Sequence, residues 1–85
     1  MKNKKLSQAQ ANVLDALMTS EGSYIYKSPY YNHNRVISKE PYLHQYGFET
    51  RELIQFSRPT FNVLLRIGAI VQDGNNKNVY KLKSK

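Results

Sequence analysis

The chain has 85 residues, a net charge of +7 from 13 basic and 6 acidic side chains, and no cysteine. This length forms one domain with a small core, and the lack of cysteine excludes disulfides and thiolate metal sites. After a basic start, residues 6–18 contain serine, glutamine, asparagine and aspartate, which makes them too polar for a signal peptide or a membrane span. We therefore predict a cytoplasmic protein with a basic tail over residues 1–6 and one domain over residues 7–83.

The excess positive charge lies at the two ends of the chain. Residues 1–5 contain three lysines and residues 77–85 contain four, whereas the residues between them contain equal numbers of basic and acidic side chains. A localised basic patch is the electrostatic signature of a protein that binds a polyanion. From charge alone, an equally good interpretation is that the lysines keep a small protein soluble.

The first expected element is a helix over residues 6–21. Ser7 and Gln10 have the spacing of a capping box, and Gly22 is a natural stop. The apolar side chains recur with helical spacing and predict the buried face: Val13, Leu14, Leu17 and Met18.

The middle of the chain is rich in tyrosine and favours strands. Residues 23–31 look extended, Pro29 restricts them to an edge or a strand end, and residues 35–38 are the candidate return strand of a hairpin. Residues 41–56 leave two alternatives open. A short helix over 41–46, ended by Gly47, is one possibility, and residues 50–56 form either a helix with Thr50 as its cap or a strand that ends just before Ser57.

The last third predicts a helix over residues 57–67 followed by a hairpin over residues 69–82. Ser57 is the expected N-cap, Pro59 suits the first turn, and Gly68 suits the C-terminal cap. Two faces follow from the helical spacing: an apolar one with Phe61, Leu64, Leu65 and Gly68, and a polar one with Arg58, Asn62 and Arg66. Residues 73–76, Asp-Gly-Asn-Asn, are a strong turn signal for the hairpin.

Two motifs resemble a known family. Residues 6–17 match the pattern Leu-Ser/Thr-x-x-Gln-x-x-Val-Leu-x-x-Leu, and residues 60–70 match Thr-aromatic/Val-x-x-Leu-x-x-x-Gly-x-Ile/Leu. With the order helix, strand pair, helix, hairpin, they resemble small winged helix-turn-helix proteins of bacteria and phages, over a little more than a quarter of the chain. The resemblance implies an α+β fold and a DNA-binding regulator, such as a small repressor or accessory factor of a phage or mobile element.

The same resemblance implies the residues that would contact double-stranded DNA. Helix 57–67 would enter the major groove and hairpin 69–82 would be the wing. Arg58 and Asn62 would reach base edges, and Thr60 and Arg66 would contact phosphates. The lysines flanking the wing would neutralise phosphates without reading sequence: Lys77, Lys81 and Lys83. The alternative for the helix is an ordinary solvated polar face.

A second hypothesis is a protein-interaction module, with a second copy or a host protein as partner. Six of the seven tyrosines lie within segment 24–46. Tyr30 and Tyr31 are adjacent, so in a strand they would point to opposite faces and at least one would be exposed. Exposed tyrosines are typical of partner surfaces, and with the lysines they would also suit single-stranded nucleic acid. The alternative is that the tyrosines fill a small core.

No pattern in the sequence indicates an enzyme, a metal site, a cofactor or a small-molecule substrate. His33 and His44 are the only histidines, and their spacing fits no metal motif. Glu49 and Glu52 have helical spacing, but solvated carboxylates are far commoner than catalytic ones. The sequence contains neither a phosphate-binding loop nor a nucleophile motif.

Overall fold

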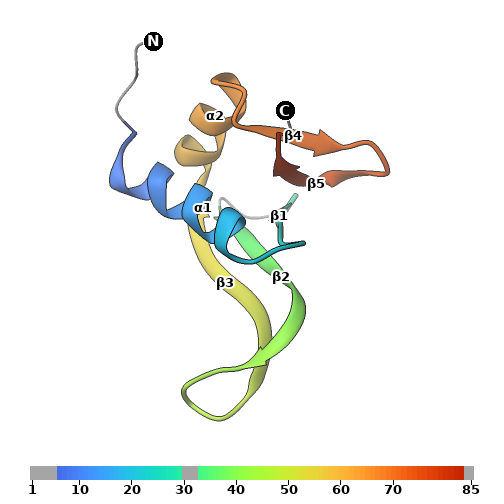
Figure 1. Ribbon diagram of the computed structural model, residues 1–85. Helices are drawn as coiled ribbons and strands as arrows, with labels where there is room; N and C mark the ends of the chain where they lie inside the picture. Colours follow the sequence, from blue (N-terminus) through green and yellow to red (C-terminus); the bar gives the residue numbers. More distant parts are fainter. Residues whose placement is uncertain (1–5, 30–32, 84–85) are drawn as a thin grey trace.

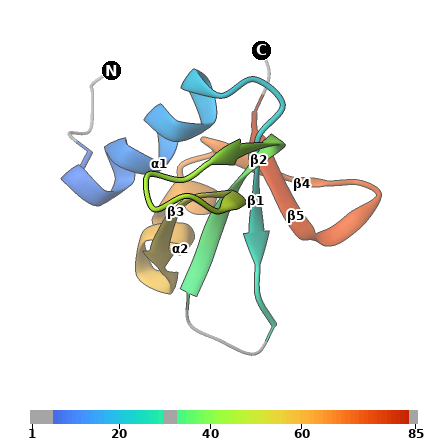
Figure 2. The same cartoon turned by 90° about the horizontal axis from the view of Figure 1, so that it is seen from below.

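The computed structural model describes residues 6–29 and 33–83 (Figure 1). The elements run in the order α1 (Gln8–Thr19), β1 (Tyr24–Lys27), β2 (His33–Leu43), β3 (Glu49–Ser57), α2 (Arg58–Arg66), β4 (Ile70–Asp73) and β5 (Asn76–Leu82). The five strands form one antiparallel sheet in the order β3-β2-β1-β5-β4. Both helices cover the same face of this sheet (Figure 2). The predicted α+β class is therefore confirmed.

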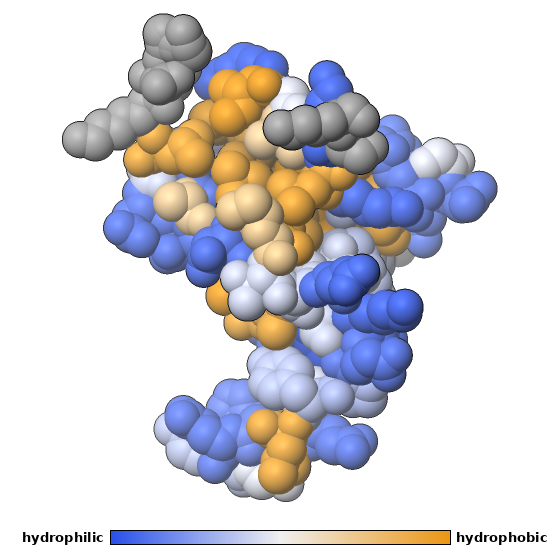
Figure 3. All heavy atoms as spheres, viewed as in Figure 1, coloured by the Kyte–Doolittle hydropathy of each residue, from blue (hydrophilic) through white to orange (hydrophobic). Residues whose placement is uncertain are grey.

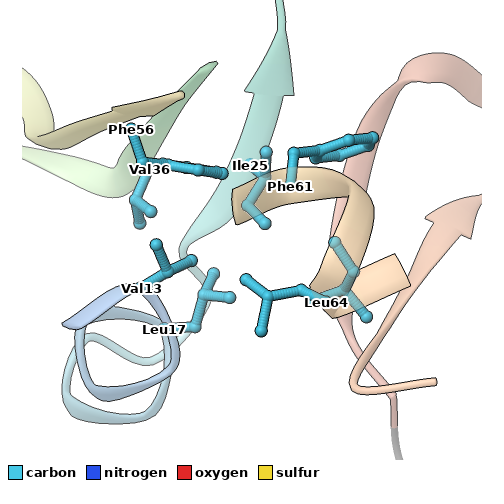
Figure 4. Close-up of a cluster of buried hydrophobic side chains, with 8 residues drawn as sticks. Val13, Leu17, Ile25, Val36, Phe56, Phe61 and Leu64 are labelled. Carbon is cyan, nitrogen blue, oxygen red and sulfur yellow. The ribbon is translucent and has the colours of Figure 1, made fainter. Parts of the chain in front are cut away.

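The core lies between the two helices and the sheet. α1 contributes Val13 and Leu17, and α2 contributes Phe61 and Leu64 (Figure 4). The strands supply the facing side chains: Ile25, Val36, Phe56 and Ile70. The ring of Tyr80 meets that of Phe61 edge to face, with centroids 4.8 Å apart. One small cluster thus positions both helices on the sheet.

Two predicted core residues lie at the surface instead. Met18 is 67% exposed and Leu65 is 40% exposed. Met18 follows buried Leu17, and Leu65 follows buried Leu64. Consecutive residues of a helix are rotated by about 100°, so each lies at the edge of the apolar stripe of its helix. A helix that packs against a single layer buries only a narrow stripe, and a neighbour at the border of that stripe remains in solvent.

The local signals at the helix ends are largely confirmed. Ser7 and Gln10 form the capping box: the Gln10 N–H donates to Ser7 Oγ at 3.2 Å, and the Ser7 N–H donates to Gln10 Oε1 at 3.1 Å. Gly68 follows α2 with φ +81°, as expected of a glycine past a helix end. Ser57 is the N-cap of α2, but its side chain makes no cap hydrogen bond.

The ambiguous segment over residues 41–56 is part of a long hairpin. β2 runs through residue 43 and β3 begins at residue 49, so the strand alternative is confirmed and the two helices are not formed. Ile54 pairs with Val36 and Phe56 pairs with Asn34, which places these residues in the sheet. Pairing with β2 decides this segment, because intrinsic strand preference depends strongly on the neighbouring strand.

The order of elements differs from the expected one by an additional strand before α2, and the architecture differs from a winged helix-turn-helix. The element before α2 is strand β3, so within residues 6–29 and 33–83 no helix-turn-helix is formed. The hairpin β4–β5 is not a separate wing either, because Ile25 pairs with Tyr80 and Tyr26 with Val79. The pairs β2–β3 and β4–β5 therefore belong to one continuous sheet.

The far part of the β2–β3 hairpin, residues 39–52, projects from the body, and we call it the arm (Figure 1). It makes the molecule elongated, with extents of 43 × 26 × 26 Å. Arg51 braces its base: Nε donates to the Ser38 carbonyl at 3.0 Å and Nη2 donates to the Tyr24 hydroxyl at 3.2 Å. Within the described part of the chain, no helix is both long and apolar enough to cross a membrane.

Candidate nucleic-acid interface

The polar face of α2 is one continuous exposed row. Arg58, Asn62 and Arg66 are all exposed, four residues apart, and the row is about 12 Å long because a helix rises about 1.5 Å per residue. Phe61 and Leu64 are buried on the opposite side and fix the orientation of the helix. No hydrogen bond or ion pair joins the three polar side chains to any other described residue. The row is therefore available to a ligand.

Thr60 does not belong to this row. Its side chain is 9% exposed, and its hydroxyl lies 3.5 Å from that of Ser57. The predicted phosphate contact at Thr60 is therefore wrong: the residue precedes Phe61 and lies on the buried side of the first turn. Arg66, by contrast, stands in the last turn, where a cation also interacts favourably with the helix dipole.

The lysines of the C-terminal hairpin are exposed but do not all lie beside α2. Tyr80 and Leu82 pack against the core, so Lys81, between them, points to the opposite face of the sheet. There Lys81 Nζ lies 3.8 Å from Asp73 Oδ2. Lys77 lies near the hairpin turn, and Lys83 follows the end of β5. The structure thus gathers the three α2 residues on one surface and places Lys81 on another.

The face of the sheet opposite the helices, which we call the outer sheet face, was not expected from the sequence. Tyr24 and Tyr26 of the central strand lie there with Val79 and Lys81, and with Asp73 they line a hollow of about 510 Å³. The Arg35 guanidinium sits 5.9 Å from the centre of the Tyr26 ring and 3.6 Å from a Glu52 oxygen. The two-residue spacing of the tyrosines was the signal that could have indicated this surface.

The tip of the arm is a second surface that the sequence did not reveal. Leu43, Tyr46 and Phe48 are 70%, 78% and 52% exposed. Figure 3 shows apolar atoms at the far end of the arm, separated from the apolar surface of the body by mostly polar residues. The sequence left open whether residues 41–56 are helix or strand. These side chains are exposed because they lie at the turn of a hairpin, so the tip could not be predicted without knowing that β2 and β3 pair.

Some sequence-based candidates stay untested. Tyr30 and Tyr31 lie outside the described residues. His33 and His44 are far apart in the hairpin, and the described residues contain no group of three or more acidic or histidine side chains arranged to hold a metal.

Comparison of the chain with protein-family models, curated proteins and solved structures finds no match. The fold itself defines a small two-layer α+β domain: two helices on one face of a five-stranded antiparallel sheet, with one hairpin extended into an arm.

Proposed function

We propose that this protein binds double-stranded DNA with α2 in the major groove. The observation that carries the proposal is the exposed row of Arg58, Asn62 and Arg66, which has no competing partner among the described residues. Arginine can grip guanine O6 and N7 in a fork, and asparagine can pair with adenine N6 and N7. The row covers about three to four base pairs, which are about 3.4 Å apart along the helix axis.

The charge distribution supports this proposal. The net charge of +7 gives a long-range attraction to phosphate. By strand alternation Lys77 and Lys83 face the same way as Lys81, away from α2, so they would add to the long-range attraction and not to contacts beside the helix. A protein that binds duplex DNA in this way would suit a regulatory role, such as that of a small repressor or accessory factor.

The first experiment is fluorescence anisotropy of a labelled random-sequence duplex against a salt series. Removing one phosphate contact lowers the slope of log K against log salt by about 0.9. We expect this for Arg66→Ala, which removes the proposed phosphate contact, and a weaker effect for Asn62→Ala, which carries no charge. Once a specific site is found, Arg58→Ala should cost about 1–3 kcal/mol of binding there.

Lys81→Ala is the matched control, because it removes the same charge from the outer sheet face. We expect its slope to stay close to that of the unaltered protein. If Lys81→Ala and Arg66→Ala weaken binding equally, DNA does not bind at α2 in particular. If the unaltered protein does not bind duplex DNA at low salt, the proposal is wrong.

A further inference from the structure

The central strand of the sheet presents two tyrosine rings on the outer sheet face. Tyr24 and Tyr26 flank Ile25, whose side chain is buried on the helix side, so the two tyrosines point to the opposite face, about 7 Å apart along the strand. Both are half-buried, both line the hollow of about 510 Å³, and neither belongs to the buried core. Part of each ring is therefore open to solvent, on the face that the two helices leave uncovered.

A guanidinium group lies beside these rings with its hydrogen-bond donors unused. Arg35 of β2 pairs with Tyr26 of β1, and its guanidinium carbon lies 5.9 Å from the centre of the Tyr26 ring. Its side chain has an ion pair with Glu52 at 3.6 Å, but it forms no hydrogen bond with any residue that the structure describes. A guanidinium carries five N–H donors in a planar fork that fits phosphate. Because the Arg35 side chain is 41% exposed, these donors are within reach of a ligand at the Tyr26 ring.

A second, smaller hollow extends the site toward β3. It has a volume of about 210 Å³ and is lined by Ser28, His33, Arg35 and Gln55. Gln55 pairs with Arg35 and therefore points to the same face. Arg35 lines this hollow and also lies at the Tyr26 ring of the larger one, so it links the two. A path from β5 to β3 along both hollows crosses three strand spacings, or about 14 Å.

The charges of the outer sheet face favour an anion. The cations that point there are Arg35, Lys77, Lys81 and Lys83, and the acids beside them are Glu52 and Asp73. The acids pair with Arg35 and Lys81, whereas Lys77 and Lys83 have no ion pair within residues 6–29 and 33–83. These groups therefore carry an excess of positive charge even with both ion pairs formed, which suits a chain of phosphates.

We propose that the outer sheet face binds single-stranded nucleic acid, with one unpaired base against Tyr24 and Tyr26 in the larger hollow and an adjoining phosphate on Arg35. A volume of about 510 Å³ lies in the range of small-ligand pockets, which is enough for one base. Aromatic side chains stack with bases of any sequence. A duplex keeps its bases stacked inside and does not offer them to the tyrosines. The site is thus separate from the α2 row and does not depend on duplex binding there.

The test is fluorescence anisotropy of the full chain with a labelled oligothymidine of about twelve nucleotides, within the site sizes of single-strand-binding domains. Tyr26→Leu should weaken binding by about ten-fold or more, because base–aromatic stacking is lost. Tyr26→Phe keeps the ring and should bind like the unaltered protein, and circular dichroism checks that both variants fold. An oligouridine of the same length distinguishes the two sources of single strands, since only RNA offers a 2′-hydroxyl.

The ion pair of Arg35 allows a change of opposite sign. Glu52→Gln removes the acid that competes with phosphate for Arg35 and keeps the shape of the side chain. It should strengthen oligothymidine binding by about two- to five-fold, the range of an exposed ion pair. Asp15→Asn is the matched control, because it removes the same charge from an exposed position on α1. Its effect should be smaller.

Three outcomes would overturn the proposal. The first is an unaltered protein that binds neither oligomer at low salt. The second is a folded Tyr26→Leu variant that binds as tightly as the unaltered protein, and the third is an equal effect of Glu52→Gln and Asp15→Asn. Arg66→Ala should weaken duplex binding and leave oligothymidine binding close to that of the unaltered protein. Failure at the outer sheet face and failure at α2 are therefore measured separately.

Discussion

At the scale of single residues, two glycines with nearly the same backbone have different surroundings. Gly22 and Gly47 have φ of +82° and +93°, which favours glycine over other residues. A Cβ at Gly47 would meet no atom within 4 Å, whereas at Gly22 it would lie 2.7 Å from Lys39 Cδ and 3.1 Å from Lys39 Cβ. The first glycine therefore combines a backbone requirement with a close approach of the arm.

We predict that Gly47→Ala lowers the stability of the protein by less than about 1 kcal/mol, because the turn can open locally and escape the strain of a left-handed backbone with a side chain. Gly22→Ala should cost about 1 kcal/mol more, because Lys39 must also move. Urea unfolding of both variants measures the difference. Equal losses would mean that Lys39 is not packed against Gly22 in solution.

Helical spacing correctly predicted which side chains lie at the centres of the buried and exposed faces of the helices. It was wrong for side chains at the edges of those faces. Phe61 and Leu64 are buried and Arg58 and Asn62 are exposed, as helical periodicity predicts. Thr60 lies four residues before Leu64, so helical spacing already places it on the apolar face, and it is buried there. Its assignment to a phosphate followed from the family resemblance and not from that spacing.

At the scale of elements, the two helices begin in chemically different ways. Ser7 accepts and donates in a complete capping box at α1, whereas Ser57 forms no side-chain cap at α2. Ser57 is also the last residue of β3, so its backbone conformation is already set by the strand. α2 therefore begins because β3 and the core place it, with Pro59 favouring the first turn.

This difference predicts unequal effects of the same substitution. Ser7→Ala should lower the free energy of unfolding by about 1 kcal/mol, the usual value of an N-cap. Ser57→Ala should change it by less than about 0.5 kcal/mol, as for a surface position without such a role. Chemical denaturation of the two variants decides this, and a larger loss at Ser57 would reveal a cap bond in solution.

At the scale of the whole molecule, the buried core lies in the body and not in the arm. Every member of the buried core lies outside residues 39–52. The sheet continues from β2 through β1 to β5, so the C-terminal hairpin is tied to the body by pairing with the central strand. Stability should therefore reside in the body.

We predict that the tip of the arm is dispensable for folding. Replacing residues 43–49 by Asn-Gly joins the paired residues Tyr42 and Thr50 through a two-residue hairpin turn. The free energy of unfolding, measured with urea, should change by less than about 1 kcal/mol. Loss of cooperative unfolding would instead make the arm part of the folding unit.

The sequence by itself determined both helices, the capping box, the C-terminal hairpin and the exposed Arg58–Asn62–Arg66 row. These features depend on short-range periodicity and local hydrogen bonds. Only the tertiary structure decided that residues 49–57 are a strand, that Lys81 lies on the opposite face from the helices, and that Leu43, Tyr46 and Phe48 stand exposed at the end of an arm. Those outcomes depend on which strands pair and in which register. The hydrophobic pattern of one segment does not show which distant segment it pairs with.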